Sequence, residues 1–220
     1  MENEFWIQAW KEGQTRFHLS EINPNLLNYV DQNPKLTQEK MNIFVPLCGK
    51  TLDLIFLRDL GHNVYGIELS QLAVEEFFKQ NDISYKIKDV GDLKAYCSKG
   101  ITIYLGDFFK LTKDLLSNIG LIYDRAAIVA LPESMRKIYF EKLTQLLEKE
   151  TKILMISFER VPQTDHGPPH SIPRQEIVNY CEGNFLYKVL NESKEKINSS
   201  KLQEVGITHM TRIIFELTKL

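Results

Sequence analysis

The sequence has few cysteines and lacks a long hydrophobic run, and both features exclude certain classes of protein. Its three cysteines, Cys48, Cys97 and Cys181, show no Cys-x-x-Cys spacing, so neither a disulfide framework nor a common zinc site is expected. No apolar stretch approaches the roughly 20 residues that span a bilayer. Acidic residues stand near the N-terminus, where a signal peptide would be positively charged. We therefore expect a cytoplasmic protein with reduced thiols and no membrane partner.

The chain also lacks an excess of positive charge. Its 220 residues carry a formal charge of -2, without a dense run of lysine or arginine. Because nucleic-acid binding normally uses a basic patch, no nucleic-acid partner is expected. The hydrophobic share of 43% is ordinary for a globular protein. No linker is evident, so residues 1–220 are predicted to form a single domain, and the lack of an obvious apolar seam favours a monomer.

Two strand–turn–helix units follow one another early in the chain. Residues 42–47 form a short apolar run that predicts a buried strand, and residues 51–60 predict a helix that stops at Gly61. Residues 64–69 and 71–80 repeat the pattern. Successive units of this kind predict a parallel sheet with right-handed crossovers. The expected fold class is α/β, with a doubly wound, mostly parallel, Rossmann-like sheet.

The remaining elements are weaker in pattern. Strands are predicted at residues 101–105, 121–124 and 152–157, a long helix at 133–149 and a short helix at 174–180. Residues 185–190 and 211–217 predict an antiparallel addition to the sheet edge, and the polar segment 191–201 between them is interpreted as a solvated hairpin loop.

Ligands of open α/β sheets bind beyond the carboxyl ends of the strands. Glu68 ends the second predicted strand, 19 residues after Gly49. A carboxylate there commonly accepts hydrogen bonds from a ribose, which indicates an adenosine-containing ligand. The alternative is a solvated glutamate at a strand end. The same rule selects the turn after Leu47, residues 106–109, and Asp124 with Arg125.

The first turn, PLCGKTLD, contains one glycine. A dinucleotide pyrophosphate needs the denser G-x-G-x-x-G turn, whereas S-adenosylmethionine has no phosphate and can bind beside a single glycine. This favours S-adenosylmethionine over a nicotinamide cofactor. A phosphate-binding P-loop is disfavoured because Phe44 occupies its earlier glycine position. Cys48 has no evident base nearby in sequence, so a small buried thiol is favoured over a nucleophile.

Aromatic residues gather near the N-terminus. Trp6 and Trp10 are four residues apart and share one helix face, and Phe17 follows soon after Gly13 ends that helix. Two interpretations stay open: an aromatic staple over the sheet edge, or a hydrophobic lid that excludes water and places π faces near a sulfonium cation.

A histidine pair lies in the later proline-rich loop. His166 and His170 have the i, i+4 spacing of helical metal ligands, but the intervening Gly-Pro-Pro segment prevents a regular helix. No metal site is expected.

Six segments together carry a family resemblance. In chain order they are FWIQAWKEGQTRFH, FVPLCGKTLDL, GHNVYGIELSQLAVEEFF, GDFF, YDRAAIVALPESMR and GPPHSIP. With these the chain resembles the thiopurine S-methyltransferases, especially the bacterial branch. The resemblance implies a class I S-adenosylmethionine-dependent methyltransferase fold, with S-adenosyl-L-methionine as cofactor and S-adenosyl-L-homocysteine as product. It also implies S-methylation of a small aromatic or heterocyclic thiol, although selenium or tellurium compounds are further acceptors by resemblance.

The resemblance assigns roles to residues as well. The positions that hold the cofactor are matched by Trp10, Leu47, Glu68, Arg125 and, on the adenine side, Asp107 and Phe108. The substrate end is matched by Trp6 and Phe17, while His170 stands where an aromatic residue is usual and is a candidate substrate-binding residue. Residues 1–20 would form an aromatic lid segment, and residues 158–220 the edge hairpin and substrate loop. Residues 84–100 match the family poorly.

The implied reaction is an in-line displacement at a sulfonium methyl group, which chiefly needs alignment and exclusion of water. A thiol has a reference pKa of about 8.5, so a useful thiolate fraction exists without a strong general base. Arg125 is the expected catalytic residue, favouring the thiolate electrostatically; the alternative is a structural salt bridge. Two other functions stay open, an NAD-dependent oxidoreductase and a non-catalytic S-adenosylmethionine-binding module.

Overall fold

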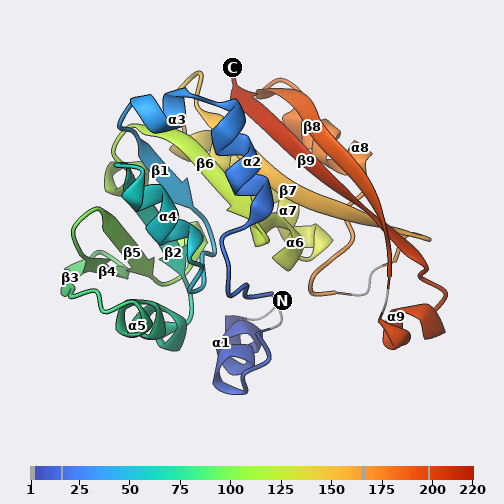
Figure 1. The fold of residues 1–220 in the computed structure, drawn as a ribbon, viewed down its shortest axis with the longest axis horizontal. Helices are drawn as coiled ribbons and strands as arrows, with labels where there is room; N and C mark the ends of the chain where they lie inside the picture. Colours follow the sequence, from blue (N-terminus) through green and yellow to red (C-terminus); the bar gives the residue numbers. More distant parts are fainter. Residues whose placement is uncertain (1–2, 16, 165–166, 198) are drawn as a thin grey trace. The chain divides into compact units, whose positions relative to one another are not determined.

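The computed structural model describes residues 3–15, 17–164, 167–197 and 199–220, with the backbone alone at Asn3 and Lys201. The chain divides into two compact units, Met1–Leu121 and Ile122–Leu220, each built from strands and helices (Figure 1). In this described part, no helix is both long enough and apolar enough to cross a membrane.

The elements of the first unit, in chain order, are α1 (Asn3–Lys11), α2 (Pro24–Gln32), α3 (Lys35–Gln38), β1 (Asn42–Val45), α4 (Asp53–Asp59), β2 (Asn63–Glu68), α5 (Gln71–Gln80), β3 (Lys86–Val90), β4 (Leu93–Cys97), β5 (Ile101–Leu105), and the 3-10 turns η1 (Phe108–Lys110) and η2 (Lys113–Leu115). The strand β6 (Ile119–Arg125) leads into the second unit, whose further elements are α6 (Ala127–Ala130), α7 (Glu133–Leu146), β7 (Lys152–Val161), α8 (Arg174–Cys181), β8 (Phe185–Lys196), α9 (Ser200–Glu204) and β9 (His209–Lys219).

The first unit contains the predicted pair of strand–helix repeats. Its strand order is β3-β4-β5-β2-β1, and β2 pairs in parallel with both β1 and β5. Ile43, Phe44, Val64 and Ile103 are almost fully buried, which explains why these strands are short apolar runs without polar alternation. The helix α5 begins as predicted, because the Ser70 side chain accepts a hydrogen bond from the Ala73 amide at 3.3 Å.

The β3–β4 hairpin was not predicted. It pairs antiparallel within itself and, through β4, antiparallel with β5. Four of the five residues of β3 are exposed, so the strand lacks the apolar alternation by which half-buried strands are recognised in a sequence. The helices α2 and α3 were likewise not among the predicted elements.

The second unit ends in the predicted antiparallel edge, but one expectation about it was wrong. Its strand order is β6-β7-β9-β8, with β9 antiparallel to both neighbours. The polar segment expected as a hairpin loop instead continues β8 as far as Lys196, and α9 follows. As an edge strand, β8 pairs with a neighbour on one side only and exposes most of its side chains. Charged residues are therefore compatible with strand structure there.

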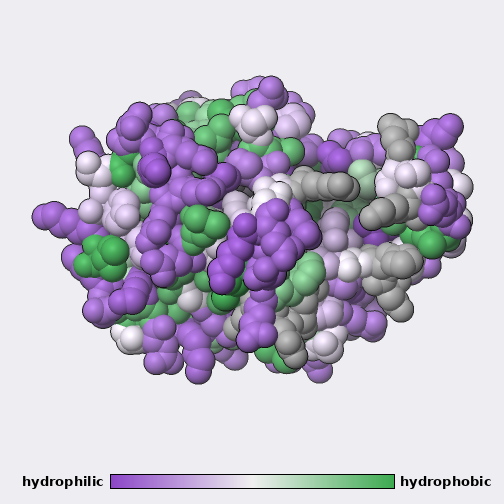
Figure 2. Space-filling model, turned by 90° about the horizontal axis from the view of Figure 1, so that it is seen from below, coloured by the Kyte–Doolittle hydropathy of each residue, from purple (hydrophilic) through white to green (hydrophobic). Residues whose placement is uncertain are grey.

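One face of the molecule shows how polar and apolar residues are distributed on the surface. The face drawn in Figure 2 is largely hydrophilic, and its hydrophobic atoms lie in small separate groups. Isolated exposed apolar side chains of this kind are normal for a globular protein.

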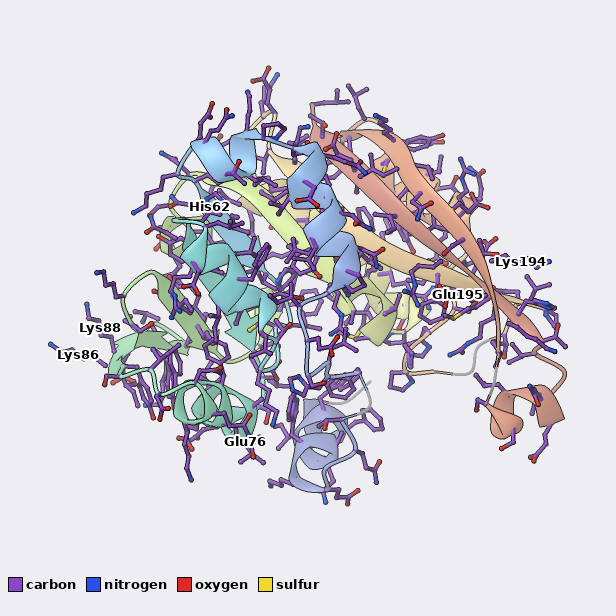
Figure 3. All side chains as sticks on the ribbon, viewed as in Figure 1. His62, Glu76, Lys86, Lys88, Lys194 and Glu195 are labelled. Atoms are coloured by element: carbon purple, nitrogen blue, oxygen red, sulfur yellow. The ribbon has the colours of Figure 1, made fainter. Side chains whose placement is uncertain are left out.

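His62 is a buried titratable group that joins several elements of the first unit. It lies in the turn between α4 and β2 (labelled in Figure 3) and is 2% exposed. The Met41 amide donates to its Nδ1 at 3.3 Å, so the neutral ring carries its proton on Nε2. The Nε2 side faces the Leu36 backbone without a hydrogen bond of ordinary geometry. Burial lowers the pKa of His62 because an imidazolium would lose its hydration here.

This burial predicts acid sensitivity. In the unfolded chain His62 takes up a proton near its ordinary pKa of about 6.5, before the folded state does so. Its contribution to the free energy of unfolding is therefore complete above about pH 6.5 and is lost as the pH falls through the lower folded pKa. Urea unfolding at several pH values should give a steeper loss of stability for the wild type than for His62→Gln. Equal slopes would contradict the prediction.

Candidate functional site

The turn after β1 has an unusual backbone. Leu47 and Gly49 both have positive φ angles, 46° and 53°, and the Cys48 amide donates to the Ile67 carbonyl at 2.9 Å. A left-handed conformation at a leucine costs of order 1 kcal/mol, and such strain concentrates at ligand-binding sites. The predicted cofactor residue Leu47 is half-buried at this turn. Residues 46–50 are called the cofactor loop below.

Glu68 fastens the cofactor loop to the end of β2. One carboxylate oxygen, Oε2, accepts a hydrogen bond from the Gly49 amide at 2.8 Å, and Oε1 accepts one from the Ser70 amide at 2.7 Å. Burial raises the pKa of Glu68, and hydrogen bonds from the backbone amides oppose that rise. Each carboxylate oxygen has a second lone pair, so the group can also accept from a ribose hydroxyl. The solvated-glutamate alternative is wrong, because the residue is only 7% exposed.

Cys48 is a packed thiol in this loop. It is 6% exposed, and a methyl group built on Gly66 would lie 2.7 Å from its Sγ atom. Burial, followed by the charge of Glu68, raises the pKa of Cys48 well above its ordinary value. The thiol is therefore neutral at physiological pH, which supports the buried-thiol interpretation and not a nucleophile.

The N-terminal aromatic residues form one cluster over the cofactor loop. The Phe17 ring meets Trp10 and Trp6 edge to face, with centroid distances of 5.5 Å in both pairs. Trp10 is 5% exposed, and its Cζ2 atom would lie 3.0 Å from a methyl group built on Gly49. A side chain at this position would push the indole away by a few tenths of an ångström, and the positive φ of Gly49 favours glycine as well. The structure thus brings Trp6, Trp10 and Phe17 together at the predicted site.

The third strand end of the first unit holds the adenine-side candidates. The Gly106 amide donates to the Glu68 carbonyl at 2.9 Å, so the ends of β5 and β2 are joined. The Asp107 side chain accepts a hydrogen bond from the Phe109 amide at 2.9 Å and begins η1. The Phe108 ring is stacked on Phe44 with centroids 6.4 Å apart. Its ring therefore belongs to the core, and contact with an adenine would fall to neighbouring backbone or to Asp107.

Arg125 lies in the second unit, at the carboxyl end of β6, and is half-buried. The preceding residue, Asp124, is fully buried and accepts hydrogen bonds from the Tyr139 hydroxyl at 2.8 Å and from the Ala127 and Ile128 amides at 3.2 Å. Burial raises the pKa of Asp124 to about 6. Since Ala126 has a left-handed φ of 70°, the carboxylate holds a strained turn that carries Arg125.

His170 also belongs to the second unit. Its amide donates to the Val129 carbonyl at 2.6 Å, which ties the predicted substrate loop to α6. Arg160 supports the same loop, since its Nη2 donates to the Pro169 carbonyl at 3.0 Å and its amide donates to the Ser171 hydroxyl at 2.7 Å. His170 is half-buried on this braced segment. His166, its partner in the i, i+4 spacing, lies outside the described residues.

Several supporting contacts were missed in the sequence. Asp124 was selected with Arg125 as a strand-end position, but its hydrogen bonds to Tyr139 and to the following turn were not predicted. A buried acid in the otherwise apolar strand LIYD could have indicated them. No local pattern pairs Cys48 with Gly66, because Cys48 lies in the loop after β1 and Gly66 lies in β2. Among the described residues, no group of three or more histidine, cysteine, aspartate or glutamate side chains is placed to hold a metal ion.

Comparison with known proteins adds family and fold. Residues 1–220 match the family model of thiopurine S-methyltransferase. The thiopurine S-methyltransferase of Shewanella sediminis is 35% identical, with 100% of this chain and 99% of the relative covered. An S-adenosylmethionine-dependent methyltransferase from Anabaena variabilis has a TM-score of 0.62 at 14% identity, covering 99% of this chain and 95% of that chain. The 1,6-didemethyltoxoflavin-N1-methyltransferase of Burkholderia thailandensis, solved with S-adenosylhomocysteine, has a TM-score of 0.56 at 10% identity, covering 99% and 86%. The predicted methyltransferase fold is confirmed.

The contact between Cys48 and Gly66 predicts a rescue. Gly66→Ala should lower the free energy of unfolding by about 1–3 kcal/mol, because the added methyl overlaps a buried thiol. Cys48→Ala removes the sulfur atom that the new methyl group would meet. The double variant should therefore lose less stability than the two single losses added together. Thermal or urea unfolding of the four proteins measures this coupling.

Gly120→Ala is the matched control for this cycle. Gly120 also lies in a strand, but a methyl group there would meet its nearest atom, Met41 Cβ, at an ordinary 3.5 Å. If Gly66→Ala lowers the free energy of unfolding by the same amount with and without Cys48→Ala, the packing argument is contradicted.

Proposed function

Because the chain belongs to the thiopurine S-methyltransferase family and is an S-adenosylmethionine-dependent methyltransferase, we propose that it methylates the sulfur of a small aromatic or heterocyclic thiol. The observation that carries this proposal is the joined arrangement of Glu68, Gly49 and Trp10. A carboxylate suited to a ribose, a glycine-poor turn and a closely packed indole face meet at one strand end. This combination suits a sulfonium-bearing nucleoside and lacks the glycine-rich turn of a nicotinamide dinucleotide site.

In this proposal the residues of the first unit hold the cofactor. Glu68 accepts hydrogen bonds from the ribose, and the cofactor loop at Leu47 receives the methionine end. Trp10 supplies an aromatic face near the sulfonium, and Asp107 with the adjacent Phe108 backbone borders the adenine. When bound, S-adenosyl-L-methionine supplies an activated methyl group and becomes the neutral S-adenosyl-L-homocysteine.

The protein's chemical task is then to align a thiolate and exclude water. Arg125 favours the thiolate anion electrostatically, and Asp124 keeps the turn of Arg125 in place through its bonds to the Ala127 and Ile128 amides. Trp6 and Phe17 provide stacking area for the ring of the acceptor, and His170 contributes to the choice of acceptor.

We also propose that residues 1–220 act as one methyltransferase domain, as a cytoplasmic monomer without a nucleic-acid partner. The negative formal charge supports the last point. The lack of an obvious apolar seam in the sequence supports the monomer, because a stable interface usually buries a contiguous apolar patch.

The cofactor proposal is tested by calorimetric titration with S-adenosylhomocysteine, beside NADH. Micromolar binding of S-adenosylhomocysteine and none of NADH are expected, a dissociation constant near 1 μM corresponding to about 8 kcal/mol. Glu68→Gln retains one acceptor oxygen and should weaken binding about tenfold, whereas Glu68→Ala, which also releases the cofactor loop, should weaken it further. A preference for NADH would restore the oxidoreductase alternative.

Thiol methylation is tested with a panel of aromatic thiols and a labelled methyl donor. Arg125→Met should reduce kcat/KM by about a hundredfold for thiols of high pKa and less for thiols already ionised at the assay pH. Arg174→Met is the control, because it removes an exposed arginine of the same unit that pairs with Glu192 at 3.3 Å. Equal losses across the panel would argue against anion stabilisation, and binding without turnover of any acceptor would indicate a non-catalytic module.

A further inference from the structure

Lys50 makes an ion pair at the end of the cofactor loop. Its Nζ lies 2.7 Å from Glu76 Oε2, and the two side chains are 15% and 34% exposed. Glu76, labelled in Figure 3, belongs to α5, the helix that packs against α1. The pair is shielded from water more than the surface pair of Lys94 and Asp89, whose side chains are 55% and 82% exposed.

Lys50 also contacts the aromatic cluster. Its Nζ lies 5.8 Å from the centroid of the Trp10 ring, within the range of a cation–π interaction. The same indole lies against Gly49, the residue before Lys50. One lysine therefore links three parts of the first unit: α5 through Glu76, α1 through Trp10, and the cofactor loop to which it belongs.

This arrangement has an electrostatic consequence for a cationic ligand. A sulfonium in contact with Trp10 would lie within about 6 Å of the ring, and Lys50 lies 5.8 Å from that ring. The two positive charges would then be at most about 12 Å apart, comparable with the Debye length of about 8–10 Å, so solvent would screen their repulsion only in part. The carboxylate of Glu76, in direct contact with Lys50, offsets that repulsion.

We propose that Lys50 and Glu76 are positioning residues for the cofactor: Lys50 holds Trp10 on the cofactor loop, and Glu76 neutralises Lys50 so that the sulfonium is not repelled. This rests on the proposed function, because it assigns Trp10 to the sulfonium end of S-adenosylmethionine. Neither residue touches the reacting atoms. Their effect is on the affinity for the cofactor, and on the difference in affinity between its cationic and neutral forms.

The test compares S-adenosylmethionine, which carries the sulfonium charge, with S-adenosylhomocysteine, which does not. Lys50→Met should weaken S-adenosylhomocysteine about fivefold, because the indole loses its anchor, and S-adenosylmethionine less, because the unpaired carboxylate of Glu76 attracts the sulfonium. Glu76→Gln leaves Lys50 unneutralised and should weaken S-adenosylmethionine about threefold more than S-adenosylhomocysteine. Lys50→Arg keeps the charge and should restore most of the affinity. A merely structural role would not change the ratio between the two ligands.

Lys94→Met is the matched control, since it removes a lysine ion pair of the same unit away from the cofactor loop, and it should leave both affinities unchanged. Calorimetry gives the affinities, and thermal unfolding verifies that each variant is folded. If Lys50→Met does not fold, the ligand ratio in Glu76→Gln decides alone. Wild-type affinities in Lys50→Met, or equal losses for both ligands in Glu76→Gln, would overturn the proposal.

A ligand-free measurement separates this proposal from the proposed function. Trp6 and Trp10 are the two tryptophans of the chain, so a Trp6→Phe background reports on Trp10 alone. Lys50→Met should make Trp10 fluorescence more accessible to acrylamide, and Lys50→Arg should not. If the wild type binds neither ligand, the proposed function fails while quenching still tests the anchor. Unchanged quenching in Lys50→Met would overturn the anchoring role whatever the ligand.

Discussion

The first unit depends on the carboxylate of Glu68. It is buried at a strand end, where it accepts hydrogen bonds from the amides of Gly49 and Ser70. One side chain thereby fixes both the loop after β1 and the turn that begins α5. A buried carboxylate is stable only when its lone pairs are satisfied, so the geometry of two backbone turns follows from this single group. The Trp10 indole can pack on Gly49 because the loop is held in this way.

The second unit also contains a buried carboxylate that holds a turn, in this case the turn that carries Arg125. Asp124 is also a buried acid at a strand end that accepts hydrogen bonds from amides of the following helix. The Tyr139 hydroxyl supplies a further donor. In both units a carboxylate at the end of a strand holds a turn in which a non-glycine residue, Leu47 or Ala126, has a left-handed backbone. Interactions that hold such turns stabilise backbone conformations that the local sequence alone would disfavour.

The sequence predicted those parts whose determinants are local. The strands at β1, β2 and β5, the Ser70 cap of α5 and the placing of Glu68 at a strand end all follow from short patterns of apolar residues and punctuation by glycine or serine. The β3–β4 hairpin and the extension of β8 could not be predicted in this way, because an exposed edge strand carries the composition of a loop. Its pairing is decided by the neighbouring strand.

In the candidate site, too, the features with local determinants could be predicted and those that depend on distant residues could not. The aromatic residues and Glu68 were identifiable from spacing and resemblance, whereas the bond of Glu68 to Gly49, the packing of Cys48 on Gly66 and the pair of Lys50 with Glu76 join residues that are distant in sequence. The core position of the Phe108 ring likewise depends on Phe44, from another strand. A single sequence identifies residue types at such positions, but their partners are set by how the strands are ordered.

The exposed strands β3 and β8 end the strand order of their units. Each presents unpaired backbone groups, and each carries lysines, including Lys86, Lys88 and Lys194 (labelled in Figure 3). Charged side chains on an exposed edge strand, lysines above all, oppose its pairing with a copy of itself, because pairing would bury them. Most side chains of these two strands are exposed, so the strands contribute little to the core. Their lysines instead favour solubility, and the proposed reaction assigns no role to them. Acetylation of the lysines on β3 and β8 should therefore lower the solubility of the protein.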